Sequence, residues 1–178
     1  MKKIGNRGFT LVELLGVLMI LSIIMAIAVP NVISVLDKNK KETYVSDAKK
    51  LISMAETQIR SDTDIDWPMP SQAVILKLSY LNNGDIDKDP EGVKYDEDRS
   101  YVAICLVGDT YTYYVQLIGT VQEGSGRGVP LNVSSNLNGD NRTDTVSSKW
   151  TDFKFTQDDI KAKLSSLSGS NITTIIEH

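Results

Sequence analysis

The first long apolar segment of the chain runs from Phe9 to Val29 and reads FTLVELLGVLMILSIIMAIAV. Its 21 residues contain a single charge, that of Glu13. About 20 apolar residues, at roughly 1.5 Å rise per residue, span the ~30 Å hydrocarbon core of a bilayer. A secretory signal has a shorter apolar region, of about 7–15 residues, followed by a cleavage site. The pattern therefore predicts a membrane-spanning helix.

After Pro30 the pattern becomes amphipathic. Apolar residues recur at alternating spacings of three and four, which places them on one face of a helix. The charged run DKNKKE at 37–42 interrupts the pattern, so packing against the rest of the protein is expected to begin near Thr43. Pro30 lacks a backbone donor and is expected to kink the helix, which ends at Ser61-Asp62. The predicted packing stripe consists of Tyr44, Val45, Ala48, Leu51, Ile52, Ala55 and Ile59.

The remaining chain alternates short apolar runs with turn residues. The clearest signal is two runs rich in Tyr, Val, Ile and Thr on either side of Gly108-Asp109, which predict a β-hairpin. Together with the long helix, the pattern predicts an α+β fold, in which the upper half of the helix packs on a small antiparallel sheet. The expected elements are a short helix 72–81, strands 101–107 and 110–118, a long loop 119–149, a strand 150–155, a helix from a Thr156 cap to about Leu164, and a last strand 171–176.

Composition and charge limit the kinds of function that the chain can have. The 178 residues suit one compact domain with an appendage. Nineteen basic residues face 23 acidic ones, and this net charge of −4 disfavours a general affinity for nucleic acids. The single Cys105 and the single His178 leave no disulfide framework, no Cys/His metal site and no internal catalytic His. We therefore expect no cofactor and no catalytic residue.

Glu13 is the unusual residue of the apolar run. An ionisable group inside hydrocarbon costs on the order of 2.5–3.5 kcal/mol on insertion scales, so a partner for it is expected. No Lys or Arg lies between Gly8 and Lys38. A cut after Gly8 would create an amine on Phe9, four residues away, which could neutralise the carboxylate. The amine of a neighbouring subunit could do the same.

The stretch Arg7-Gly8-Phe9-Thr10-Leu11-Val12-Glu13, followed by the apolar run and Pro30, resembles the class III signal of type IV prepilins. The resemblance implies cleavage by a prepilin peptidase between Gly8 and Phe9, on the cytoplasmic side, and N-methylation of Phe9. It also implies that Glu13 contacts the Phe9 amine of an adjacent subunit. Helix is expected to be lost locally between Gly16 and Pro30 in the assembled fibre.

The resemblance divides the chain into a leader (1–8), a hydrophobic helix of membrane and fibre core (9–30), its amphipathic continuation (31–60) and a globular head (61–178). Loss of the leader leaves 16 basic side chains against 23 acidic ones, a net charge of −7. The expected partners are further copies of the chain, the prepilin peptidase, the pilus assembly machinery and, before assembly, the membrane. The precursor is expected in the bacterial inner or cytoplasmic membrane, and the product in an extracellular filament.

The function expected on these grounds is that of a structural subunit of a type IV pilus, supporting adhesion, aggregation or surface motility. A pseudopilin of a type II secretion or DNA-uptake system remains an alternative, and a membrane-anchored surface enzyme is a more distant one. Asp85, Asp87 and Asp89 alternate as in a calcium loop. The EF-hand pattern fails, because it needs Gly sixth and Glu twelfth, where this chain has Pro90 and Asp96. A different calcium site remains open.

Overall fold

The computed structural model describes residues 10–81, 84–119, 126–139 and 142–178, so the leader and Phe9 lie outside the described residues. The chain divides into two compact units, 1–39 and 40–178, and helix α1 contributes to both. The elements are α1 (Leu11–Ser61), β1 (Gln72–Lys77), α2 (Leu78–Leu81), β2 (Tyr101–Val107), β3 (Thr110–Ile118), β4 (Gly128–Val133), the 3-10 turns η1 (Ser134–Leu137), η2 (Arg142–Thr145) and η3 (Trp150–Asp152), α3 (Gln157–Ser168) and β5 (Thr174–Glu177).

The second unit is built on a five-stranded sheet with the order β4-β3-β2-β1-β5. The predicted hairpin forms with the expected bounds, and its turn contains Gly108 at φ +61°, a conformation that favours glycine. The expectation of a purely antiparallel sheet is wrong at one edge, because β5 pairs parallel to β1. The sheet is therefore mixed, within the predicted α+β plan.

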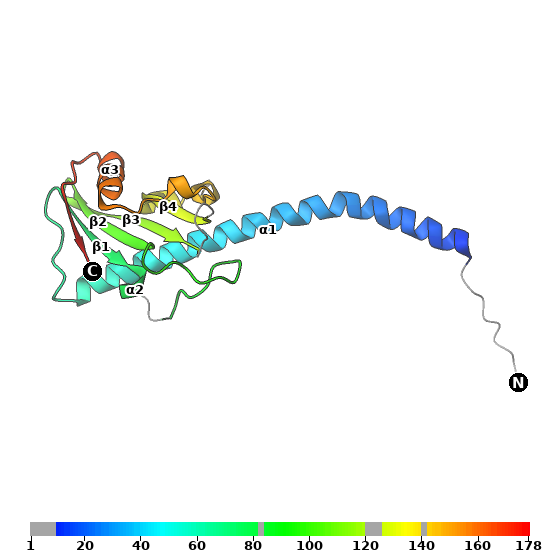
Figure 1. Ribbon diagram of the computed structural model, residues 1–178, viewed down its shortest axis with the longest axis horizontal. Helices are drawn as coiled ribbons and strands as arrows, with labels where there is room; N and C mark the ends of the chain where they lie inside the picture. The colour runs from blue at the N-terminus through cyan, green and yellow to red at the C-terminus, as the bar shows by residue number, and fades with distance from the viewer. Residues whose placement is uncertain (1–9, 82–83, 120–125, 140–141) are drawn as a thin grey trace, which may run out of the picture. The chain divides into compact units, whose positions relative to one another are not determined.

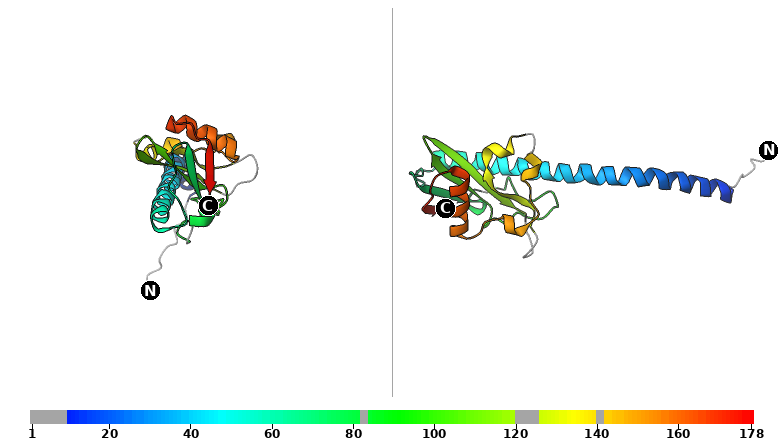
Figure 2. Two further views of the ribbon diagram at one scale, coloured as in Figure 1. Left: turned by 90° about the vertical axis from the view of Figure 1, so that its left-hand side faces the viewer. Right: turned by 90° about the horizontal axis from the view of Figure 1, so that it is seen from above.

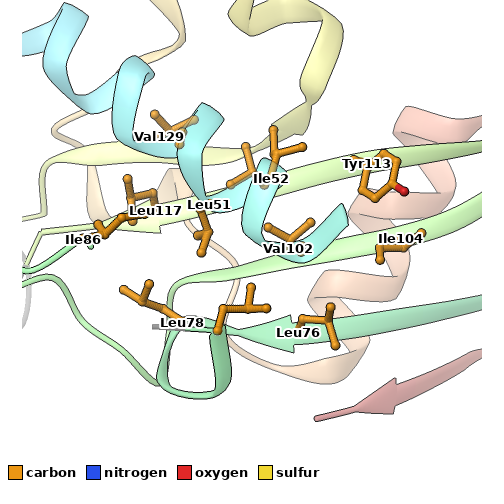
Figure 3. Packing of buried hydrophobic residues seen from close by; sticks show 14 of the residues in the cluster. Leu51, Ile52, Leu76, Leu78, Ile86, Val102, Ile104, Tyr113, Leu117 and Val129 are labelled. Carbon is orange, nitrogen blue, oxygen red and sulfur yellow. The ribbon is translucent and has the colours of Figure 1, made fainter. Parts of the chain in front are cut away.

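The head part of α1 and the helix α3 cover opposite faces of this sheet (Figures 1 and 2). Side chains alternate along each strand, so Val102 and Ile104 face α1 while Ala103 and Cys105 face α3. Figure 3 shows Leu51 and Ile52 of α1 among Val102, Leu117 and Val129 of three neighbouring strands. The main core therefore lies between one face of α1 and the sheet.

The predicted short helix over 72–81 is wrong for its first six residues. Gln72–Lys77 forms β1, a central strand between β2 and β5, and only Leu78–Leu81 is helical. Four successive residues of β1 are buried, because the sheet is covered on both faces. A strand buried on both sides is a continuous apolar run, which periodicity alone does not distinguish from a helix.

The predicted loop 119–149 also contains a strand, the edge strand β4, and the turns η1 and η2. The predicted strand over 150–155 is instead the turn η3 followed by an irregular segment. That segment is held by the buried amide of Gln116 on β3, which donates to the Lys154 carbonyl (2.8 Å) and accepts from the Lys154 N–H (2.8 Å). One side chain thus supplies the hydrogen bonds that a neighbouring strand would have offered.

The C-terminal elements follow the sequence more closely. Thr156 caps α3 by accepting from the N–H of Asp159 (3.2 Å). The helix runs to Ser168, one turn beyond the predicted end, and Gly169 at φ +69° closes it. The last strand begins at Thr174, three residues later than predicted.

Gly128 provides a test of the sheet packing. A Cβ at this position would clash with the carbonyl oxygen of Leu117, which belongs to the backbone and cannot turn aside as a flexible side chain could. We expect Gly128→Ala to lower the free energy of unfolding by about 1–3 kcal/mol. The change can be measured by denaturant titration of the detergent-solubilised chain, followed by tryptophan fluorescence. Gly139→Ala is the matched control, because nothing lies within 4 Å of its Cβ. Equal stability of the two variants would contradict the described packing of β3 and β4.

Candidate assembly site

The first unit presents an uncovered apolar helix. Between Leu11 and Leu36 the large hydrophobic side chains are 43–81% exposed. Contiguous apolar surface of this extent is uncommon on soluble monomers and marks a membrane or protein contact. By length and composition, α1 is long and apolar enough to cross a membrane. The segment predicted as a membrane and fibre-core helix is thus helical from Leu11 onward, and none of the large hydrophobic side chains along it is buried within its own chain.

Helix α1 begins with a reciprocal cap formed by Thr10 and Glu13. The backbone N–H of Thr10 donates to Oε2 of Glu13 (2.9 Å), and the Thr10 hydroxyl donates to the same oxygen (2.7 Å). The N–H of Glu13 donates in turn to Oγ1 of Thr10 (3.3 Å). This is a capping box, which satisfies backbone donors that the first helical turn leaves unpaired.

The cap gives Glu13 a partner that the sequence analysis did not consider. The pattern Thr-x-x-Glu directly before an apolar run is a recognised helix-start signal and would have predicted it. The predicted partner, the amine of Phe9, lies outside the described residues. Within one chain, Thr10 therefore reduces the cost of placing this carboxylate in an apolar helix, because two donors satisfy Oε2.

Gly16 and Pro30, the predicted kink residues, both lie inside α1, which is helical from Leu11 to Ser61. Nothing lies within 4 Å of a Cβ placed on Gly16. Next to Pro30, the side-chain amide of Asn31 donates to the Ile27 carbonyl (3.0 Å). The expected loss of helix concerns the assembled fibre and stays a prediction.

All seven residues of the predicted packing stripe, from Tyr44 to Ile59, are buried in the core of the second unit. Two further contacts that the sequence analysis missed anchor α1 there. The hydroxyl of Tyr44 donates to Oδ2 of Asp89 (2.9 Å), and the hydroxyl of Tyr95 donates to Oδ2 of Asp47 on α1 (2.8 Å). The two tyrosine rings meet edge to face, 6.1 Å apart. These paired contacts fix the loop 84–100 on the helix.

Burial in this cluster favours the neutral phenols. Burial, and next the hydrogen bond to Asp89, raise the pKa of Tyr44 far above its ordinary value. Burial and then Asp47 do the same for the pKa of Tyr95. Both tyrosines therefore remain hydrogen-bond donors at any physiological pH. Gly119 is required beside them, since a Cβ there would lie 2.5 Å from Oδ2 of Asp89.

Three aspartates of the suspected calcium loop, Asp87, Asp89 and Asp96, are engaged within the protein. Besides Tyr44, Asp89 accepts from the N–H groups of Glu91 and Val93 (2.9 Å each). Asp87 lies 3.8 Å from Lys94, and Asp96 accepts from the N–H of Arg99 (3.0 Å). In the described part of the chain, no group of three or more His, Cys, Asp or Glu side chains is placed to hold a metal ion. The aspartate spacing is explained by turn chemistry and by anchoring of the loop.

Cys105 is fully buried in β2, and burial raises the pKa of its thiol to about 12. A thiol that stays protonated is a weak nucleophile. The side chain therefore packs as a small apolar group between the sheet and α3.

Comparison with known proteins agrees with this arrangement. Residues 4–29 match a family model described as the prokaryotic N-terminal methylation motif. The chain is 31% identical over 78 residues to the ComG operon protein 3 homolog of Bacillus licheniformis, a match that covers 43% of this chain and 76% of the relative. No solved structure gives a significant match.

An uncovered N-terminal helix with this motif, packed by its upper half on a small sheet, defines a pilin-like structural protein. The chain belongs to the family of type IV pilins and pseudopilins.

The capping box can be tested without changing Glu13. Thr10→Val keeps the side-chain shape and removes the hydroxyl, which should cost about 0.5–2 kcal/mol of helix-start stability. We expect the Glu13 amide to exchange with solvent roughly fivefold faster in detergent micelles, measured by hydrogen-exchange NMR. Thr10→Ser is the matched control and should exchange as the unmodified chain does. Equal rates in Thr10→Val would mean that the hydroxyl does not cap α1.

Proposed function

We propose that the chain is a structural subunit of a type IV pilus. A prepilin peptidase cuts it between Gly8 and Phe9, Phe9 is N-methylated, and the assembly machinery moves the subunit from the cytoplasmic membrane into an extracellular homopolymer. The filament would then support adhesion, aggregation or surface motility.

The observation that carries this proposal is the apolar surface of α1 from Leu11 to Leu36, which no described residue covers. Removal of apolar surface from water contributes roughly 25 cal/mol per Å², so these side chains are stable either in lipid or against other copies of the helix. A helix that suits both environments is suited to move from one to the other. The second unit buries its own core and can remain outside as the head.

In this proposal, Glu13 sets the axial alignment of neighbouring α1 helices in the fibre. Its Oε2 is held by Thr10 in the single chain, and the carboxylate still carries a negative charge beside the helix start. In a fibre core the methylated amine of a neighbour would offer it a cationic partner. An unpaired buried charge is strongly unfavourable, so only alignments that bring the two groups together would be stable.

A pseudopilin of a type II secretion or DNA-uptake system is the second candidate. The methylation motif and the uncovered helix fit both functions, because both rest on polymerisation of the same kind of tail. The net charge of −7 after processing disfavours DNA binding by the isolated subunit. Electron microscopy of cells with and without the chain distinguishes the two, since long surface fibres indicate a pilus and short ones a pseudopilus.

Cleavage after Gly8 and methylation of Phe9 predict the mass of the N-terminal peptide. The protein isolated from sheared fibres should begin at Phe9 and carry one methyl group on its amine, as shown by mass spectrometry of the N-terminal peptide. The same peptide from cells without peptidase activity should begin at or near Met1. A fibre protein that retains Met1 would contradict cleavage at Gly8.

The charge of Glu13 can be separated from its capping role. Glu13→Gln keeps a side chain that is able to form the capping box, but it removes the charge that would pair with the amine. We expect at least a tenfold loss of sheared fibres, while the subunit remains in the membrane fraction. Ser22→Ala, a polar change on the same helix that leaves every charge in place, is the control for general damage. Normal fibre yield from Glu13→Gln would show that the charge does not set register.

A further inference from the structure

One end of the head carries an acidic and aromatic surface with no assigned role. The loop that follows α1 and the turn between β2 and β3 lie at this end (Figure 1). Trp67 from the loop contacts Tyr111 from the hairpin, with ring centroids 4.4 Å apart. Tyr111 is 38% exposed, and Met69, two residues after Trp67 in the chain, is 65% exposed. We call the surface formed by Asp62, Asp64, Asp66, Trp67, Asp109 and Tyr111 the acidic cap.

Three of the four carboxylates of the acidic cap form no ion pair with a described residue. Asp64, Asp66 and Asp109 are exposed, and none of the three forms an ion pair within the described ranges. Asp62 accepts a hydrogen bond from Tyr80 (2.6 Å), which lowers the pKa of its carboxyl group and keeps it ionised. The acidic cap is therefore anionic at neutral pH, and its aromatic rings offer faces that attract cations.

Residues of the opposite charge lie on α1 itself, near the middle of the helix, well before the acidic cap that follows its C-terminal end. Residues 37–42 include Lys38, Lys40 and Lys41. Lys38 is exposed, and Lys40 makes a half-exposed ion pair with Glu91 (3.4 Å), a kind of contact that contributes little to stability. Within the second unit, the 21 residue-to-residue steps from Lys40 to Ser61 rise about 32 Å along the helix. Lys40 and Lys41 of a chain therefore cannot reach the acidic cap of the same chain.

We propose that the acidic cap binds the lysine segment 38–41 of a second copy of this chain, as the axial contact between heads in the filament. This rests on the proposed function. A shift of about 32 Å along α1 brings the lysines of one copy beside the acidic cap of another. Such a contact joins two different surfaces, so it leaves both ends free to repeat and produces a filament rather than a closed dimer.

The contact adds selectivity to the apolar association. Burial of the helices supplies most of the attraction but is not directional, so it permits many alignments. Opposite charges at a fixed spacing along the helix favour one axial alignment and oppose those that place like charges together. The acidic cap would then act on subunit order and spacing more than on total affinity.

The test uses full-length chains in cells that assemble them. Lys38→Cys and Asp64→Cys are placed in the same chain, and intact fibres are treated with a short bis-maleimide. Cys105 is buried and has a raised thiol pKa, so it does not react. We expect a ladder of covalent multimers on a denaturing gel. The control pairs Lys38→Cys with Asp158→Cys, an exposed acidic position on α3, and should give no ladder.

Charge reversal gives an independent test of the proposed contact. Asp64→Lys combined with Asp66→Lys should reduce fibre yield roughly tenfold, and adding Lys38→Glu and Lys40→Glu to that chain should restore it. Reversal of Asp158 should leave the yield unchanged. Restored fibre yield would require that a chain carrying Asp64→Lys and Asp66→Lys still folds. It would therefore also exclude misfolding as the cause of the first loss.

The outcomes separate the two proposals. Absence of any filament from the unmodified chain would overturn the proposed function. Filaments without a ladder, a ladder from the Asp158 control pair, or a lack of restoration by the second reversal would overturn the contact alone. A ladder that forms equally in subunits kept in the membrane by Gly8→Leu would also overturn it, because it would not depend on assembly.

Discussion

The structure depends on how the apolar side chains of a single helix are removed from water. From Tyr44 onward the stripe on α1 is covered by the sheet of its own chain, and the covered residues form the main core. Before residue 37 the apolar surface extends around the helix, and no described residue buries it. Since helix geometry is the same in both parts, the difference in cover decides which part folds with the head and which must find lipid or another subunit.

Polar contacts hold the loop 84–100 on α1 at the point where burial of the helix begins. Tyr44 and Asp47 lie one turn apart on α1, and each pairs with a residue of the loop 84–100. Glu91 from that loop also contacts Lys40 and Arg127 (3.4 and 3.3 Å). A buried carboxylate is acceptable only when it is hydrogen-bonded, so these pairs hold the loop in one position.

The predictions that succeeded were those in which the local pattern and the final environment agree. The hairpin at Gly108-Asp109 needs only a turn and two strand-forming runs, and the Thr156 cap acts within one helical turn. The prediction for 72–77 failed because a strand covered on both faces has no polar alternation to reveal it. The segment 150–155 alternates as a strand does, yet its backbone pairs with no strand among the described residues. The side chain of Gln116 on β3 supplies two hydrogen bonds to Lys154 instead.

The sequence by itself determined the apolar helix, its methylation motif, the packing stripe and the position where packing begins. These features depend on residues that are close together in the chain, because helical periodicity and capping act over a few residues. Only the tertiary structure decided the partners of Asp47 and Asp89, the parallel edge strand β5 and the grouping of Trp67 with Tyr111. Each of these joins residues far apart in the chain, and a pairing of that kind depends on how whole elements pack, which no local pattern records.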